Sequence, residues 1–94
     1  MPYYVYILAS RKNGTLYTGV TNNVVRRIHE HLTGVASEFT RRYGVNILVY
    51  VETHDEVEIA IAREKRIKRW RRVWKIELIE ENNPDWRDLF DDLM

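Results

Sequence analysis

The chain has 94 residues, of which 45% are hydrophobic and 12% aromatic, with four Gly and two Pro. This length gives one domain with one core, and the composition is that of a folded globular protein. The absence of Cys excludes a disulfide scaffold, a thiolate zinc site and a Cys nucleophile. No apolar run approaches the roughly 20 residues of a membrane span, and no signal peptide is recognisable, so we expect a soluble cytoplasmic protein without a membrane partner.

The charge is divided unevenly along the chain. Residues 1–76 carry 14 basic and 7 acidic side chains, a net charge of +7, whereas residues 77–94 carry seven acidic side chains and Arg87, a net charge of −6. A basic body favours a polyanionic partner, because clustered Lys and Arg bind phosphate backbones electrostatically. A solvated helix face balanced by an acidic tail would give the same counts. The charge distribution therefore suggests nucleic acid as a partner but does not establish it.

Two strands open the predicted fold. Residues 3–9 and 15–20 are rich in β-branched and aromatic residues, and Asn13-Gly14 between them is a hairpin signal. Side chains alternate across a strand and a loop of even length keeps the parity, so the two strands share a face. That face carries Tyr6, Leu8, Tyr17 and Gly19. Two phenols can then meet at one site beside Gly19, although Tyr is also a favoured strand residue without any further role.

A helix is predicted after the hairpin. Thr21 or Asn22 can cap its beginning, and Gly34 ends it. Its apolar positions at helical spacing are Val24, Val25, Ile28 and Leu32. Arg27 and His31 lie one turn apart on one margin of this stripe. An Arg at a core margin often extends to solvent and a buried His is often satisfied by hydrogen bonds, so the pair suggests a site without establishing one.

The second half of the chain adds one strand and three helices. In chain order we predict a loop over 35–44, a third strand over 45–51, a long basic helix through Trp70, a helix over 73–81 and a short helix over 85–93. Asp55 and Glu58 predict a capping box at the start of the long helix, and Asn83-Pro84 ends the following one. The last helix is amphipathic, with Trp86, Leu89, Phe90 and Leu93 on one side. The predicted fold is α+β, a small three-stranded antiparallel sheet flanked by helices in the order ββαβαα plus a short C-terminal helix.

Glu64 is the sharpest polar signal. The apolar stripe of the long helix consists of Val57, Ala60, Ile61 and Ile67, and Glu64 falls in its middle. Burying an ionised carboxylate without a partner is costly, so this side chain must meet a cation, a metal ion or water in a cleft. Lys68 and Arg71 are near enough on the helix to supply a salt bridge. A structural ion pair and a metal or catalytic site both stay open.

These residues follow one another in a familiar order. Tyr4-Val5-Tyr6, Tyr17-Thr18-Gly19, Arg27, His31 and a later helical Glu64 resemble the GIY-YIG nuclease superfamily. More closely, the chain resembles the small single-domain bacterial proteins of that superfamily known as UPF0213. The resemblance implies a GIY-YIG-like nuclease domain over residues 1–82 and an acidic tail helix over 83–94 that packs on the same domain.

Members of the superfamily cut DNA phosphodiesters with one divalent metal ion. The resemblance implies that Glu64 ligates Mg²⁺ or Mn²⁺ and that Arg27 stabilises the charged phosphate. It also implies that Tyr6 and Tyr17 line the site, one of them acting as or assisting the general base, and that His31 lies in the site. Hydrolysis of a diester needs an activated water, a Lewis acid and a cation, which this set would supply. A phenol is a poor base at neutral pH unless nearby positive charge stabilises its phenolate.

The chain departs from the superfamily pattern in places. Tyr4 replaces the first Gly of the family name, and Thr18 replaces the Ile of the second tripeptide. Many superfamily nucleases place an Asn about a dozen residues after the metal-binding Glu, whereas Ile76 occupies that position here. The 94 residues hold no recognisable appended DNA-binding domain, so we expect the chain to bind its substrate through its own basic helix. The cations predicted to bind nucleic acid are Lys65, Arg66, Lys68, Arg69 and Arg72.

The sequence therefore predicts a metal-dependent endonuclease that hydrolyses DNA phosphodiester bonds, with selectivity for DNA structure as one form of this activity. The alternative is a nucleic-acid-binding module that keeps the fold with little or no catalysis. A third reading is a protein-interaction domain that uses Trp86 and Phe90, although these aromatics also suit the core. DNA is the predicted partner, RNA stays open, and no obligate protein partner is indicated.

Overall fold

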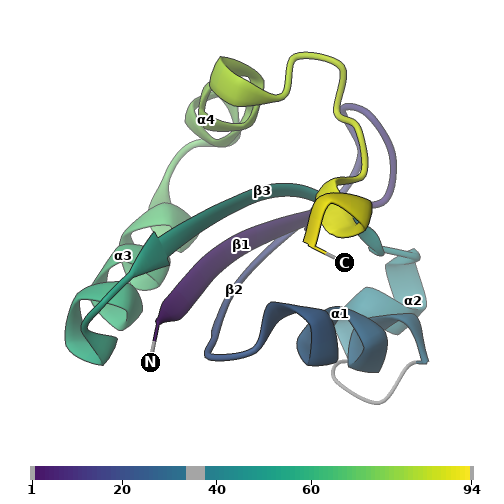
Figure 1. Ribbon diagram of the computed structural model, residues 1–94. Coiled ribbons are helices and arrows are strands. Elements are labelled where there is room, and N and C mark those ends of the chain that lie inside the picture. The colour runs from purple at the N-terminus through teal and green to yellow at the C-terminus, as the bar shows by residue number, and fades with distance from the viewer. Residues whose placement is uncertain (1, 34–37, 94) are drawn as a thin grey trace.

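The computed structural model describes residues 2–33 and 38–93. Its strands β1 (Tyr3–Ala9), β2 (Leu16–Thr21) and β3 (Ile47–His54) form one antiparallel sheet in the order β2-β1-β3. Its helices are α1 (Val24–Leu32), α2 (Glu38–Tyr43), α3 (Val57–Arg69), α4 (Arg72–Asn82) and a short 3₁₀ helix, η1 (Leu89–Leu93). Figure 1 shows α1 and α2 on one side of the sheet and α3 and α4 on the other. The predicted α+β class and three-stranded antiparallel sheet are confirmed.

The central strand β1 is buried on both faces, so it divides the apolar residues between two cores, where the chain length predicted a single one. One core contains Val5, Ile7, Ala9, Val49, Tyr50, Ala60, Ile67, Ile79 and Trp86, and the other contains Tyr6, Leu8, Val24, Ile28, Val45 and Leu48. The register pairs Tyr6 with Gly19 and Leu8 with Tyr17. This pairing confirms that these four residues share one face of the hairpin, the face covered by α1.

The beginning of α1 differs from the prediction. Asn23, rather than Thr21 or Asn22, is the N-cap, and its Oδ1 accepts a hydrogen bond of 3.0 Å from the Arg26 amide. Thr21 lies two residues earlier, where its Oγ1 accepts from the Asn23 amide at 3.1 Å. The Thr21 hydroxyl therefore forms the turn that leads into the helix, and it does not cap the helix itself. Gly34, predicted to end this helix, lies outside the described residues.

The buried stripe of α1 is also rotated from the predicted one. Val24 and Ile28 are buried as expected, but Val25 and Leu32 are 39% and 53% exposed. His31 is buried in their place, with 4% of its surface exposed. His31, predicted at the margin of the stripe, thus lies inside it, and hydrogen bonds at both ring nitrogens compensate its burial.

Residues 38–43 form the short helix α2, where a loop was predicted over 35–44; positions 35–37 lie outside the described residues. The helix ends at Gly44, whose φ of 62° lies in the left-handed region. The Val45 amide donates to the Thr40 carbonyl at 3.0 Å, the closing bond of a Schellman motif. Gly44 after a Glu38–Arg41 pair was the sequence signal for this helix.

The junction between β3 and α3 corrects two further boundaries. The strand begins at Ile47 rather than Val45 and extends to His54, beyond the predicted end at residue 51. The chain then bends at Asp55, and Glu56 is the N-cap of α3 without a side-chain capping bond. The predicted capping box of Asp55 is therefore wrong, because α3 begins at Val57 and Asp55 lies one residue before its N-cap.

The C-terminal tail runs along β3. Residues 85–93 were predicted as one helix, but only Leu89–Leu93 coil, as a 3₁₀ turn. Trp86 precedes it with a left-handed φ of 57°, and its indole Nε1 donates to Glu80 at 2.7 Å. Trp86 packs in the core beneath α3 and α4, whereas Leu89 and Phe90 pack against the core beneath α1. These aromatics therefore lie on two cores rather than on one side of a helix.

None of the helices within residues 2–33 and 38–93 is both long and apolar enough to cross a membrane.

Candidate active site

Tyr6 lies in the middle of β1 with 2% of its surface exposed. Gly19 faces it from β2, and a Cβ at residue 19 would overlap the Tyr6 hydroxyl and ring. Only Gly therefore leaves space for the phenol at this pairing position. On the side away from Gly19, the Tyr6 hydroxyl contacts His31, whose Nε2 lies 3.0 Å away. The phenol of Tyr6 is thus enclosed between a strand glycine and a helix histidine.

His31 links the hairpin to the two small helices. Its Nε2 contacts the Tyr6 hydroxyl and its Nδ1 lies 3.0 Å from the Thr40 Oγ1 of α2. Burial lowers the pKa of His31, and the positive charge of Arg27 lowers it further, against a smaller opposite effect of Glu30. A neutral imidazole donates through one nitrogen and accepts through the other. His31 therefore holds two hydroxyl side chains in place without carrying a charge at neutral pH.

Tyr17 occupies the more open side of the same cluster. Its ring centroid lies 6.4 Å from that of Tyr6 and 5.2 Å from that of His31, edge to face. Phe39 of α2 packs on it at 6.1 Å. Tyr17 is half-buried, whereas Tyr6 is buried. The two phenols predicted to share a site are therefore neighbours, and Tyr17 is the one within reach of solvent.

Two charges from different helices act on the Tyr6 phenol. Burial raises the pKa of Tyr6 well above its ordinary value of 10, and Tyr17 raises it further. The positive charge of Arg27 lowers this pKa, and the negative charge of Glu64 raises it again. Tyr6 therefore stays protonated at neutral pH.

Arg27 extends from α1 beside His31 with 37% of its side chain exposed. Its Nη1 lies 3.5 Å from the Glu30 Oε1, one turn further along the helix. An exposed pair of this kind is weak, so it leaves the guanidinium free to turn toward an anion. Arg27 can therefore supply a cation at the solvent side of the cluster.

Glu64 is buried on α3 between Ala60 and Ile67, with 9% of its surface exposed. Its Oε1 lies 3.2 Å from the Nζ of Lys68, whose side chain is 51% exposed. Of the two cations considered as partners, the structure pairs Lys68 with the carboxylate. Val57 and Ile61, assigned to the same stripe, are 36% and 38% exposed, so the buried face is narrower than predicted and Glu64 forms a large part of it.

Metal ligands are sparse around this carboxylate. Within the described ranges, no group of three or more His, Asp or Glu side chains could hold a metal ion. Mg²⁺ keeps several waters and commonly binds through one or two carboxylates together with substrate phosphates. Glu64 alone therefore fits a hydrated Mg²⁺ or Mn²⁺ completed by a substrate, and it does not fit a closed site made of protein ligands.

The predicted nucleic-acid contacts lie on the outside of α3 and at the start of α4. Four exposed cations belong to α3: Lys65, Arg66, Lys68 and Arg69. Arg72 begins α4, and its Nη2 donates to the carbonyls of Asn13 and Gly14 at 2.7 and 2.5 Å. This side chain holds the hairpin turn against α4, a contact that the sequence did not suggest.

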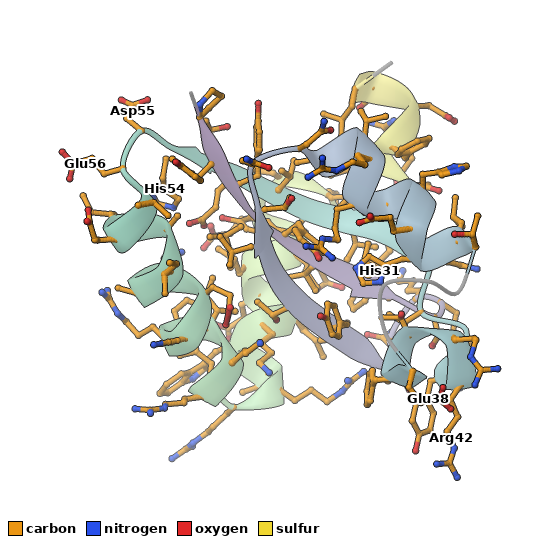
Figure 2. All side chains as sticks on the ribbon, turned by 90° about the horizontal axis from the view of Figure 1, so that it is seen from below. His31, Glu38, Arg42, His54, Asp55 and Glu56 are labelled. Atoms are coloured by element: carbon orange, nitrogen blue, oxygen red, sulfur yellow. The ribbon has the colours of Figure 1, made fainter. Side chains whose placement is uncertain are left out.

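Thr40 and Phe39 belong to the cluster although sequence reasoning missed them. Both lie on α2, which was predicted as a loop, so neither had a face assigned to it. The Asn absent from the superfamily position is not supplied by Asn83, which is 5% exposed and donates to the Val49 carbonyl at 3.1 Å. Ile76, at that position, packs against the core. Figure 2 shows His31 on the side of α1 and α2, far from His54 at the beginning of α3.

Comparisons with known proteins identify the family of the chain. The family model described as the GIY-YIG catalytic domain matches residues 2–77. A UPF0213 protein of Staphylococcus haemolyticus is 39% identical over 79 residues, which are 84% of this chain and 95% of the relative. A UPF0213 protein of Oceanobacillus iheyensis is 41% identical over 78 residues, 83% of this chain and 90% of the relative.

A solved structure is similar along nearly the whole chain. The solution NMR structure of a UPF0213 protein from Bacillus halodurans superposes with a TM-score of 0.58 at 34% sequence identity. The superposition covers 94% of this chain and 93% of the other. The matched residues 2–77 include the phenols, the imidazole and the charged side chains of the cluster at the hairpin. The chain belongs to the GIY-YIG family, within its UPF0213 group.

Proposed function

We propose that this protein is an endonuclease that hydrolyses phosphodiester bonds in DNA with the help of one divalent metal ion. One observation carries the proposal: Tyr6, Tyr17 and His31 pack together from β1, β2 and α1, and the charges of Arg27 and Glu64 both act on the Tyr6 phenol. The match to the GIY-YIG catalytic domain supports a nuclease reaction. A DNA substrate also favours the predicted cytoplasmic location.

Glu64 is the proposed ligand of Mg²⁺ or Mn²⁺. When bound, such an ion supplies a Lewis acid for the phosphoryl oxygen and a site that orients water. Lys68 holds the carboxylate in the structure, and its half-exposed ammonium can move into solvent when a cation takes its place. Arg27 then offers a second positive charge, because the phosphate gains negative charge as the diester is attacked.

The two phenols have different proposed roles. Tyr6 is enclosed by Gly19 and His31 and keeps its proton, so it positions the imidazole and the strand rather than touching substrate. Tyr17 is half-buried on the solvent side of the cluster, where its hydroxyl can hold or deprotonate the attacking water. Positive charge beside a phenol is what makes it an effective base, and Arg27 and the metal ion would provide it.

A second candidate function is a nucleic-acid-binding module with little or no catalysis. Two observations favour it: Lys68 already neutralises Glu64, and Ile76 stands where many superfamily nucleases have Asn. Such a module would bind DNA through the same basic helices. It would show a steep dependence of affinity on salt, since phosphate contacts release counterions.

The experiment that separates the two candidates is a cleavage assay with purified protein, supercoiled and branched DNA, and Mg²⁺ or Mn²⁺. We expect product with the wild-type chain and none with Glu64→Gln. Glu58→Gln is the matched control, because it removes the same charge from an exposed position of the same helix. Equal cleavage by Glu64→Gln would refute the assignment of Glu64, and DNA binding without any metal-dependent product would favour the binding module.

The roles of the phenols are tested by Tyr17→Phe and Tyr6→Phe. We expect Tyr17→Phe to lower the cleavage rate by about 10²-fold and to change the pH profile, as loss of a general base does. Tyr6→Phe removes the bond to His31 and should lower the rate less, with the shape of the pH profile kept. A larger loss in Tyr6→Phe than in Tyr17→Phe, with an altered profile, would exchange the two roles.

A further inference from the structure

A basic groove lies between the hairpin and the start of α4. Its volume is about 410 Å³, and it is lined by Thr15, Leu16, Trp70, Arg72 and Lys75. Lys75 is half-buried, and its Nζ donates to the Lys68 carbonyl at 3.3 Å. Among the residues the structure describes, no carboxylate lies within ion-pair distance of Arg72 or Lys75. The groove therefore collects positive charge that the protein itself does not neutralise.

These cations act on one another. Burial lowers the pKa of Lys75, and the charges of Arg72 and Lys68 lower it further. An anion in the groove would relieve this repulsion, and a phosphodiester is an anion of suitable charge and size. Lys68 connects the two regions through two different atoms, because its carbonyl accepts from Lys75 and its Nζ contacts Glu64 of the candidate active site.

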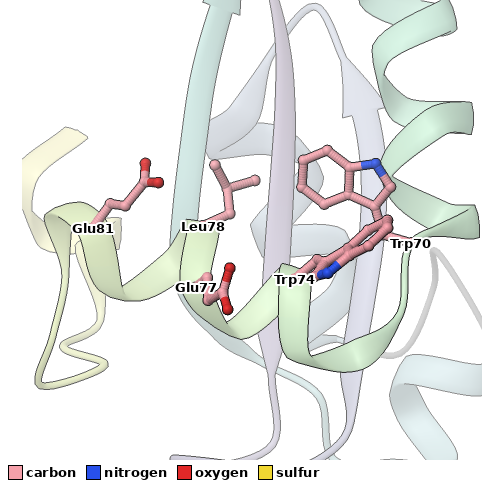
Figure 3. Close-up of a pocket in the computed structure, with 5 residues that line it drawn as sticks. All are labelled: Trp70, Trp74, Glu77, Leu78 and Glu81. Carbon is pink, nitrogen blue, oxygen red and sulfur yellow. The ribbon is translucent and has the colours of Figure 1, made fainter.

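An apolar groove adjoins the basic one and shares Trp70 as a wall. It has a volume of about 370 Å³ and is lined by Trp70, Trp74, Glu77, Leu78 and Glu81. Figure 3 shows the two indoles close together at one end and Glu81 at the other. Their ring centroids lie 6.3 Å apart, nearly perpendicular at 83°, and Trp74 is 46% exposed. The Arg71 guanidinium carbon lies 5.5 Å from the Trp74 ring centroid, so this exposed aromatic side chain already contacts a cation and lies beside two more that have no carboxylate partner among the described residues.

We propose that the two grooves bind an unpaired segment of nucleic acid, with a backbone phosphate at Arg72 and Lys75 and the adjoining base stacked on Trp74 beside Trp70. The inference rests on the proposed function and names its substrate class, a DNA with a single-stranded part. Aromatic stacking with a positively charged groove is the general way in which proteins bind single strands. A base inside a duplex is stacked on both sides, so it cannot reach an indole.

The acidic end of the apolar groove sets a limit to this segment. Glu77 and Glu81 repel a phosphate, so the strand must leave the groove before it reaches them. A basic peptide would instead prefer that end and avoid Arg72 and Lys75. Arg72 and Lys75 favour nucleic acid over a basic peptide, because they line the basic groove and Trp70 lines both grooves.

The test measures binding without cleavage. Glu64→Gln protein in EDTA is titrated with a 12-nucleotide single strand and with the matching duplex, and tryptophan fluorescence is followed. Trp86 is buried, so quenching reports on Trp70 and Trp74. We expect the single strand to bind at least tenfold more tightly than the duplex and to quench fluorescence, since stacking on an aromatic side chain is worth about 1–3 kcal/mol per base.

Variants locate the contact. Trp74→Leu should remove the preference for the single strand, and Lys75→Gln should weaken its binding and lower the salt slope by about one. Arg42→Gln is the matched control, because it removes an exposed cation from α2, and it should leave the preference for the single strand unchanged. The proposal is overturned if the duplex binds as tightly as the single strand, or if Trp74→Leu keeps the preference. Binding of an oligolysine peptide that depends on Glu77 and Glu81, without quenching by the single strand, would assign the groove to a protein partner instead.

The outcome is independent of the cleavage assay. Metal-dependent cleavage of DNA without any preference for single strands would refute this inference and leave the nuclease in place. Preferential binding of single strands through Trp74 and Lys75, without cleavage by the wild-type protein, would support the inference and refute the nuclease.

Discussion

Two carboxylates of this protein, the partly buried Glu52 and the buried Glu64, lie in contrasting surroundings. Glu52 of β3 accepts a hydrogen bond from Tyr50, lies 2.5 Å from His54 Nε2, and accepts from Arg63 Nε at 3.0 and 3.2 Å. We call these four residues the Glu52 cluster. Glu64, the next residue on α3 after Arg63, is about as enclosed, with 11% of its side chain exposed against 16% for Glu52. Within the described residues its single ion-pair partner is Lys68.

The difference separates a structural carboxylate from an available one. An ionised carboxylate has about four acceptor positions, and the Glu52 cluster fills them with donors held by a strand and a helix. Arg63 is further fixed by Trp70, whose ring centroid lies 5.1 Å from its guanidinium carbon. Glu64 has the cost of burial with much less compensation, so a ligand can still gain from binding it. Burial alone does not identify a functional acid, whereas burial with few donors does.

The largest expected effect is on catalysis by Glu64→Gln. We expect the cleavage rate to fall by at least about 10³-fold, because a bound metal ion contributes several kcal/mol to the transition state. The free energy of unfolding should change by less than about 1 kcal/mol, since the half-exposed Lys68 remains solvated without its partner. Cleavage kinetics and urea denaturation measure the two quantities on one preparation. A large loss of stability in Glu64→Gln with unchanged cleavage would show that Glu64, like Glu52, has a structural role.

The opposite pattern is expected for Glu52→Gln. Removing the charge leaves Arg63 and His54 partly buried without a counterion, so the free energy of unfolding should fall by roughly 3 kcal/mol. The folded fraction should still cut DNA at a rate within about threefold of wild type. Urea denaturation followed by circular dichroism gives the first number. A stability equal to wild type would show that the cluster is not the structural element described here.

The two regions should also respond to pH in different ranges. Burial raises the pKa of Glu52, but hydrogen bonds from Tyr50, Arg63 and His54 outweigh it and keep this pKa below its ordinary value of 4.5. The stability from Glu52 is therefore present above pH 4.5 and lost as the pH falls through the lower, folded value. Burial lowers the pKa of His31 from 6.5, so a second loss begins already below pH 6.5, where the unfolded chain binds the proton first.

Denaturation midpoints between pH 3 and pH 8 test both ranges. Glu52→Gln should flatten the dependence below pH 4.5, and His31→Gln should flatten the part just below pH 6.5. A wild-type stability that stays constant from pH 8 to pH 5 would contradict the assignment of His31.

The smallest effect is expected for Lys68→Gln. Exposed ion pairs are worth about 0.2–1 kcal/mol, so freeing Glu64 from Lys68 should tighten the binding of Mn²⁺ in the absence of DNA by about twofold to fivefold. Calorimetry or line broadening of the Glu64 amide by Mn²⁺ measures this affinity. Glu64→Gln is the control that should abolish the signal. Weaker Mn²⁺ binding in Lys68→Gln would show that this cation supports the site rather than competes for it.

Much of the fold, and the position of Glu64 on an apolar helix face, was predictable from the spacing of side chains within single strands and helices. The alternation in the hairpin placed Tyr6 and Tyr17 on one face, and the helical wheel put Glu64 on a buried stripe. Both inferences need only the geometry of one element. The full burial of His31 was not predicted. It depends on a hydrogen bond to Thr40, which lies in a helix that the sequence pattern did not reveal.

The Glu52 cluster shows the other limit. Tyr50, Glu52 and His54 alternate along one strand, so their shared face could be inferred from the sequence. Arg63 comes from a helix, and the choice of Arg63 rather than another of the many cations depends on how α3 packs against β3. The same holds for Arg72, which contacts the hairpin turn at Asn13 and Gly14. These two residues precede Arg72 by 59 and 58 positions in the sequence. Such pairings depend on how separate elements pack together, and this packing leaves no repeating pattern in the sequence.

The path of the tail along β3 has a consequence for self-association. β3 is an edge strand, and its Leu48 amide donates to Asp88 at 3.3 Å while its Val49 carbonyl accepts from Asn83. Free donors and acceptors on a sheet edge are templates for pairing with another chain. The tail, which passes over β3 in Figure 1, occupies two of these groups with the side chains of Asp88 and Asn83, and its sequence is rich in Asp. A chain cut before Asn83 would therefore expose a strand able to pair with its own copies, and we expect it to form oligomers even under conditions in which its sheet stays folded.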